Sequence, residues 1–193
     1  MMKRQGVLLA SLMGIAMLMA ACGGHDGNGS NPATGQSVDD AQSTTPQPAA
    51  FSCPAGYKKF DLADGTVPNA DVSIITDDGI AMFTFRTPAT GRTDVAVCLG
   101  KPDPVPAGVQ ADYVYELIEH GDIKQLLDRR LTLNFTTDVR PTRTPTRIEQ
   151  AKITDGAVTY LPVIDGPIYV APPNYSLVAK PNEAGLYVVR LTQ

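Results

Sequence analysis

The chain has 193 residues and a formal net charge of −4, with 19% charged residues and no tryptophan. A charge this mild and slightly acidic argues against a nucleic-acid-binding protein, which needs a basic face. Hydrophobic residues make up 43% of the chain and aromatic residues only 6%, so aliphatic side chains must build the core.

The first 21 residues have the form of a secretory signal peptide. A basic start, Lys3-Arg4, precedes an uncharged apolar run over 7–21 that is too short to span a bilayer comfortably. The run ends in two alanines, and Cys22 follows them directly. This arrangement resembles the lipobox of bacterial lipoproteins, with Met19 standing where Leu is usual.

The resemblance implies cleavage before Cys22 and acylation of this cysteine, including palmitate. Gly23, rather than Asp, after the cysteine implies sorting to the outer membrane. Because each buried acyl methylene contributes about 0.8 kcal/mol, several chains would hold the protein at the membrane effectively permanently. An ordinary signal peptide and a retained membrane helix are the alternatives, and stop-transfer charges for the latter are missing.

Residues 22–50 contain the acylated cysteine and a linker rich in Gly, Ser, Thr, Asn and Pro. Their few apolar residues cannot bury enough surface to offset the entropy of ordering the segment. We expect a flexible tether with a root-mean-square end-to-end distance of roughly 30 Å. His25 lies here, and a lone linker histidine is a poor metal ligand.

Residues 51–193 then form one ordinary domain. Its two cysteines, Cys53 and Cys98, enter an oxidising compartment after export, so we expect a disulfide. A redox pair or a metal site is the alternative, but the spacing is not Cys-x-x-Cys and no histidine stands nearby.

Strand signals dominate this domain. Residues 71–76 and 80–86 flank Asp77-Asp78-Gly79, and Asp-Gly supplies the positive φ angles of a hairpin turn. The same chemistry recurs where 153–156 precede 157–161, and where 163–166 precede 167–170. Apolar and polar residues alternate over 131–137, which is the period of a half-buried strand. Further strands are predicted over 93–99 and 186–192.

Residues 111–130 are ambiguous. Tyr113, Tyr115 and Leu117 share one face if the segment is a strand, and a turn at residues 120–122 would complete a hairpin. A pair of helices, with Asp122 capping the second, is the alternative. We favour the hairpin because the flanking strands need partners.

Many short strands with Gly and Pro turns indicate an all-β fold, an immunoglobulin-like or related antiparallel β-sandwich with one disulfide. Two small β subdomains, divided near Pro141 and Pro145, are the alternative.

Catalytic patterns are weak. The domain has a single histidine, His120, and no Gly-x-Ser-x-Gly motif for a nucleophilic serine. Several carboxylates fall in Asp-Gly turns, where the turn conformation of the backbone explains the aspartate. Asn134 and Asn174 begin glycosylation sequons, which we interpret as chance. We therefore predict no catalytic residue, no metal and no cofactor.

Three arginines are less easily explained. Arg140, Arg143 and Arg147 follow one another along a Pro/Thr segment without an intervening acid. Their guanidinium groups are candidates for contact with anionic sugar or phosphate groups. The competing interpretation is a solvated connection whose arginines pair with scattered carboxylates.

Three functions follow from these observations. The first is a non-enzymatic binding or assembly module, anchored at the outer membrane, for another envelope protein, peptidoglycan or lipopolysaccharide. The second is an inhibitor that plugs a hydrolase through a protruding loop over 100–110 or 138–148. The third is an enzyme acting on envelope polymers.

Overall fold

The computed structural model describes residues 51–62, 67–90, 94–143, 145–166 and 168–192. All of them belong to the unit Gln47–Gln193, one of two into which the chain divides. The predicted signal peptide (1–21), Cys22 and the predicted linker lie outside the described residues. Within the described part, no helix is long and apolar enough to cross a lipid bilayer.

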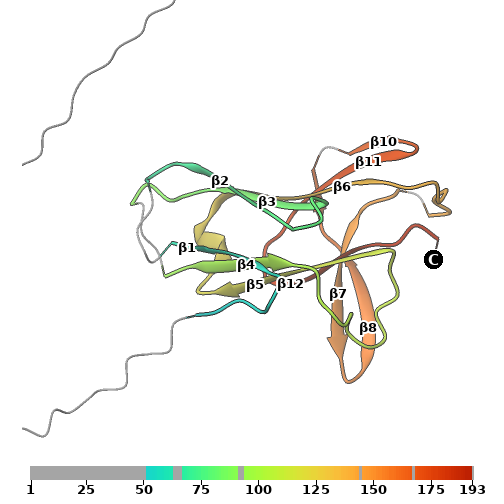
Figure 1. Ribbon diagram of the computed structural model, residues 1–193, viewed down its shortest axis with the longest axis horizontal. Helices are drawn as coiled ribbons and strands as arrows, with labels where there is room; N and C mark the ends of the chain where they lie inside the picture. Colours follow the sequence, from blue (N-terminus) through green and yellow to red (C-terminus); the bar gives the residue numbers. More distant parts are fainter. Residues whose placement is uncertain (1–50, 63–66, 91–93, 144, 167, 193) are drawn as a thin grey trace, which may run out of the picture. The chain divides into compact units, whose positions relative to one another are not determined.

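Two antiparallel sheets form a sandwich, which confirms the predicted fold class (Figure 1). The first sheet has the order β1-β4-β5-β12-β7-β8, and the second has the order β10-β11-β6-β3-β2, with β9 also pairing with β11. The strands of the first sheet are β1 Lys58–Asp61, β4 Ala96–Gly100, β5 Tyr113–His120, β12 Gly185–Val189, β7 Ile148–Thr154 and β8 Ala157–Pro162. The strands of the second are β10 Tyr169–Ala171, β11 Asn174–Lys180, β6 Leu127–Thr136, β3 Ala81–Arg86, β2 Asp71–Ile75 and β9 Ile164–Asp165.

The main core lies between the sheets and follows the alternation of the strands. Leu131, Leu133 and Phe135 of β6 are buried as their period predicts. Tyr115 of β5 and Tyr187 of β12 belong to the same core from the first sheet, and each residue is 1% exposed. Each sheet contains strands from before and from after Pro141 and Pro145. The described residues therefore form one sandwich and not two β subdomains.

The first sheet is also covered on its outer face. Val114 and Val188 point away from the main core and belong to a second, smaller apolar cluster. Val109 and Ala111, near the end of the connection between β4 and β5, pack against them. The end of this connection therefore packs against the outer face of the sheet, whereas most of residues 101–108 are exposed.

Two of the three predicted Asp-Gly turns connect paired strands. Gly79, at φ 70°, closes β2 onto β3, while Asp155 (φ 52°) and Gly156 (φ 79°) close β7 onto β8. Figure 1 shows the β7–β8 hairpin extending away from the two layers. The third turn, at Asp165-Gly166, was predicted wrongly: β9 and β10 pair with opposite ends of β11 rather than with each other.

The prediction for residues 111–130 is correct in its strands and wrong in their pairing. β5 pairs with β4 and β12 in the first sheet, whereas β6 pairs with β3 and β11 in the second. Between them, Gly121 adopts φ 76° and a single 3-10 turn covers Ile123–Gln125. The Asp122 side chain caps that turn by accepting a hydrogen bond from the Lys124 amide. The connection thus crosses between the sheets.

The predicted disulfide is confirmed between Cys53 and Cys98, whose Cα atoms are 5.7 Å apart. Cys98 lies on β4 and is fully buried, so the bridge fastens the segment before β1 to the interior of the first sheet. Close to this bridge, the ring of Tyr57 covers Gly100 at the end of β4. A Cβ atom at position 100 would lie 2.3 Å from the Cγ atom of Tyr57.

Candidate anion-binding site

Three arginines from two separate segments line one small pocket at an end of the first sheet. Arg143 and Arg147 come from the connection between β6 and β7, and Arg190 directly follows β12. Glu149 of β7 lies among them, and Pro145 completes the lining of a volume of about 40 Å³. The pocket has room for a small ionic group but not for a large molecule.

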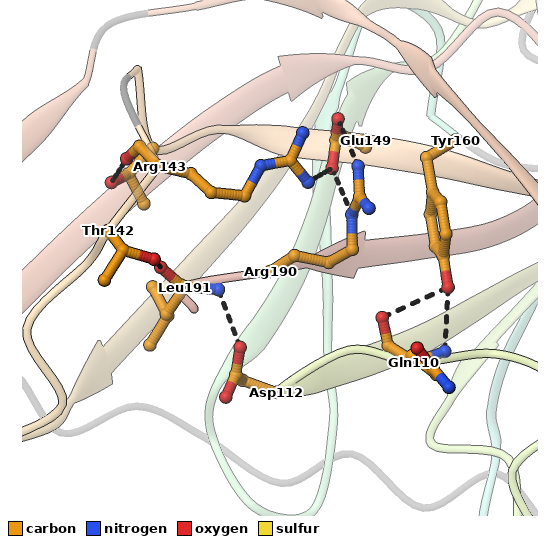
Figure 2. Close-up of polar contacts among 9 residues, drawn as sticks. Gln110, Asp112, Thr142, Arg143, Glu149, Tyr160, Arg190 and Leu191 are labelled. Atoms are coloured by element: carbon orange, nitrogen blue, oxygen red, sulfur yellow. Dashed lines mark hydrogen bonds and ion pairs between the residues drawn. The ribbon is translucent and has the colours of Figure 1, made fainter. Parts of the chain in front are cut away.

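The structure separates the three arginines predicted as a set. Arg143 and Arg147 line the pocket, while Arg140 is exposed and lies outside its lining. Figure 2 shows Arg143 and Arg190 directed at Glu149 from two sides. Arg190 is the member that sequence reasoning missed.

Backbone contacts hold the β6–β7 connection against the end of β12. The Thr142 amide donates a hydrogen bond to the Leu191 carbonyl oxygen at 2.8 Å. The Leu191 amide in turn donates to Asp112 Oδ2 at 2.6 Å (Figure 2). Because Arg143 follows Thr142, and Arg190 precedes Leu191, these bonds fix the backbone from which both arginine side chains extend.

Glu149 forms a bidentate pair with Arg190. Arg190 Nε lies 2.8 Å from Glu149 Oε2, and Arg190 Nη2 lies 3.0 Å from Oε1. The Glu149 side chain is 8% exposed and that of Arg190 14%, so the pair is largely removed from water. Two parallel charge-assisted bonds fix the orientation of both groups.

Tyr160 of β8 supports the Arg190 guanidinium from one side. The guanidinium carbon lies 3.7 Å from the centroid of the Tyr160 ring, which is a cation–π contact. The backbone of Gln110 holds the Tyr160 hydroxyl in place. The Gln110 backbone N–H donates a hydrogen bond to this hydroxyl at 2.7 Å, and the Gln110 backbone carbonyl oxygen accepts one from it at 3.1 Å (Figure 2). Arg190 is therefore clamped between a carboxylate and an aromatic ring.

Glu149 is ionised in this environment. Burial by itself raises the pKa of the carboxyl, but the hydrogen bonds and charge of Arg190, with the charges of Arg143 and Arg147, outweigh it and hold the pKa below its usual range. One carboxylate therefore faces three guanidinium groups, which leaves the pocket with two excess positive charges.

One donor in the pocket has no hydrogen-bond acceptor. Arg143 Nη1 is buried and forms no hydrogen bond within the described part of the chain. It lies 3.5 Å from Glu149 Oε2, which makes an ion pair without hydrogen-bond geometry. Leaving a buried donor without an acceptor costs about 1–3 kcal/mol. An anion with several oxygen atoms would neutralise the excess charge.

The other chemistry-bearing side chains do not assemble in this way. His120, at the end of β5, is exposed and stacks on Phe51 with ring centroids 5.5 Å apart. Among the residues described, His, Cys, Asp and Glu side chains form no group of three suited to holding a metal ion. No known family model, curated protein or solved structure matches this chain.

Proposed function

We propose that the protein is a lipid-anchored, non-enzymatic binding module of the bacterial cell envelope that recognises an anionic group through Arg143, Arg147 and Arg190. The observation that carries the proposal is the excess of guanidinium over carboxylate groups in the lining of this pocket. Guanidinium groups match the planar, multi-oxygen geometry of carboxylates and phosphates.

The location follows from the sequence. The lipobox-like segment before Cys22 implies acylation and attachment to the outer membrane. The disulfide between Cys53 and Cys98 is consistent with export, because such bonds persist in oxidising compartments. The linker would give the sandwich a root-mean-square distance of roughly 30 Å from its membrane anchor.

The ligand is then an envelope component that presents phosphate or carboxylate groups. Lipopolysaccharide and peptidoglycan both carry such groups, and so does an acidic envelope protein. The volume of about 40 Å³ fits one oxyanion group at the surface of a larger partner.

The test measures binding of the purified protein to lipopolysaccharide and to isolated peptidoglycan. Arg143→Ser combined with Arg147→Ser should weaken binding at least about tenfold, a loss of 1.4 kcal/mol that corresponds to one charge-assisted bond. Arg140→Ser is the matched control, since Arg140 is exposed in the same segment outside the pocket. Added salt should weaken wild-type binding by screening. Equal binding by the double variant and the wild type would contradict the proposal.

The anchor has its own test. Replacing Cys22 with Ala should abolish palmitate incorporation and release the protein from the membrane fraction. A variant that still partitions with membranes and still incorporates palmitate would remove the lipoprotein assignment, whatever the arginine pocket binds.

A further inference from the structure

Strand β8 forms one edge of the first sheet, and that edge is open. β8 is the last strand in the order of its sheet, so one of its two sides has no strand beside it. Figure 1 shows that the β7–β8 hairpin extends away from the two layers, which makes the strand accessible. Within the described part of the chain, no backbone hydrogen bond from a loop or turn reaches this edge. A second strand can therefore approach it.

The sequence of β8 differs from that of the other edge strands among the described residues. Native proteins protect exposed sheet edges against pairing with another chain by charged residues, by proline or by short length. β1 carries Lys58, Lys59 and Asp61, β2 begins with Asp71, and β9 and β10 have only two and three residues. β8 has six residues, none of them charged, and its single proline stands at the last position. It is thus the edge best suited to pairing with another strand.

The turn of the hairpin shows which β8 residues direct their backbone groups outward. The two-residue loop 155–156 has positive φ angles, so the flanking residues, Thr154 and Ala157, exchange both of their backbone hydrogen bonds. Bonded and non-bonded positions alternate along an antiparallel ladder. Val158 and Tyr160 are therefore non-bonded positions, and their N–H and C=O groups point away from β7 to the open edge.

The β8 sequence is complementary to itself when two copies run antiparallel about Thr159. Val158 of one copy then lies opposite Tyr160 of the other, and this pair occurs twice because the arrangement has twofold symmetry. Both residues direct backbone groups outward, so the two pairs supply four intermolecular backbone hydrogen bonds. Their side chains also match, because an aromatic and a β-branched residue form a favourable cross-strand pair.

The opposite face of the strand matches in the same register. Leu161 lies opposite Ala157 of the second copy, and Leu161 is 41% exposed in the single chain. The two Thr159 residues face each other at the twofold axis, where threonine pairs are favourable. Because β8 has no charged residue, this pairing brings no like charges together within the two strands.

We propose that the protein forms a homodimer by antiparallel pairing of the β8 strands of two copies, which joins their first sheets into one continuous sheet. Tyr160 supports Arg190 of the arginine pocket, so the dimer carries both arginine pockets on the same face of that sheet. The paired segment is short, and we expect a transient dimer with a Kd on the order of 100 µM in solution. Confinement of two copies to one membrane by the proposed anchor would raise their effective concentration. The dimer does not depend on anion binding by the arginine pocket.

The first test is disulfide cross-linking of the full-length protein in intact cells. Thr159→Cys places two thiols at the twofold axis, in a non-hydrogen-bonded pair whose Cα atoms would lie about 4.5 Å apart. This distance is within the range that a disulfide requires. Mild oxidation should link most of this variant into a homodimer. Thr136→Cys, which replaces an exposed threonine on β6 of the second sheet, is the matched control and should stay mostly monomeric.

A mixture of two cysteine variants tests the register. Positions 157 and 161 face each other only across the two copies. Ala157→Cys mixed with Leu161→Cys should therefore form a cross-linked heterodimer faster than either variant links to itself.

Sedimentation equilibrium of the purified Cys22→Ala protein, which lacks the lipid, measures the same dimer at concentrations from about 10 µM to 1 mM. Adding Thr159→Lys should raise the Kd at least about fivefold, because two cations would then lie directly opposite each other. Thr159→Val keeps the β-branched shape and should leave the Kd within about twofold. Thermal unfolding of each variant separates loss of pairing from loss of fold.

Three results would overturn the proposal: a protein that stays monomeric up to 1 mM, equal cross-linking at positions 159 and 136, or a Thr159→Cys protein that links to a different envelope protein and not to itself. Thr159→Lys should bind phosphate at the arginine pocket as the wild type does. Failure of the dimer can therefore be distinguished from failure of the anion site.

Discussion

Replacing Glu149 should have two opposite effects on the arginine pocket. It should destabilise the fold, and it should make the pocket a better site for an added anion. Glu149→Ala removes both hydrogen bonds to Arg190 and leaves a guanidinium that is only 14% exposed without its counter-ion. Breaking a buried pair by deleting one partner costs about 3–5 kcal/mol. The pocket is open on one side, so we expect the lower end, about 3 kcal/mol.

Glu149→Gln gives a graded comparison. Its amide oxygen can still accept one of the two Arg190 bonds, so about half of the loss, roughly 1.5 kcal/mol, is expected. In thermal unfolding, a domain of this size loses about 3 °C in Tm per kcal/mol, which predicts a fall of about 10 °C for Ala and about 5 °C for Gln.

Phosphate should restore part of this loss. With the carboxylate gone, an added anion can take its place beside Arg143, Arg147 and Arg190, and a ligand that binds only the folded state stabilises it. We expect phosphate to raise the Tm of Glu149→Ala more than that of the wild type, compared with sodium chloride at equal ionic strength. This reasoning would be refuted if the Tm of Glu149→Ala lay within about 1 °C of the wild-type Tm. It would also be refuted if phosphate and chloride changed the Tm of the variant equally.

Three further predictions concern stability. Replacing both Cys53 and Cys98 with Ala opens a loop with a sequence separation of 45 residues and should cost about 4 kcal/mol in the loop-entropy model; a loss below about 1 kcal/mol in urea unfolding would contradict it. Gly100→Ala should cost about 1–3 kcal/mol, because its Cβ would overlap the Tyr57 ring, and an unchanged Tm would show that the ring moves aside freely. The lowered pKa of Glu149 means that its stabilisation is present above the unfolded pKa, about 4.3, and is lost as pH falls through the folded value. The difference in Tm between wild type and Glu149→Gln should therefore shrink from pH 7 to pH 3, and a constant difference would count against the ion pair.

Local patterns predicted the strands because burial on one face leaves a period in the sequence. The alternation over 131–137 and the Asp-Gly turns before 80 and 157 appear in the structure as expected. Pairing was harder to predict. A glycine such as Gly121 can lie in a hairpin turn within one sheet or in a connection that crosses between two sheets. Which of the two forms depends on the strands with which β5 and β6 pair. Those partners lie far away in the chain, so no local signal separates the two outcomes.

For the same reason, the sequence singled out only two of the three arginines that line the pocket. Arg143 and Arg147 belong to a segment with three closely spaced arginines, whereas Arg190 is a single cation directly after an apolar terminal strand. The register of β12 on β7 places Val188 opposite Glu149, so Arg190 lies two residues further along the same face. This register can be known only from the sheet.

The most direct measurement follows the side-chain Nε–H resonances of Arg143, Arg147 and Arg190 by NMR while phosphate is added at constant ionic strength. An anion-binding pocket predicts saturable shifts with one common Kd, unaffected by Arg140→Ser and abolished at Arg190 by Arg143→Ser with Arg147→Ser. Shifts that stay linear in phosphate, or that appear equally at Arg140, would contradict a built anion site and leave the arginines as a solvated connection.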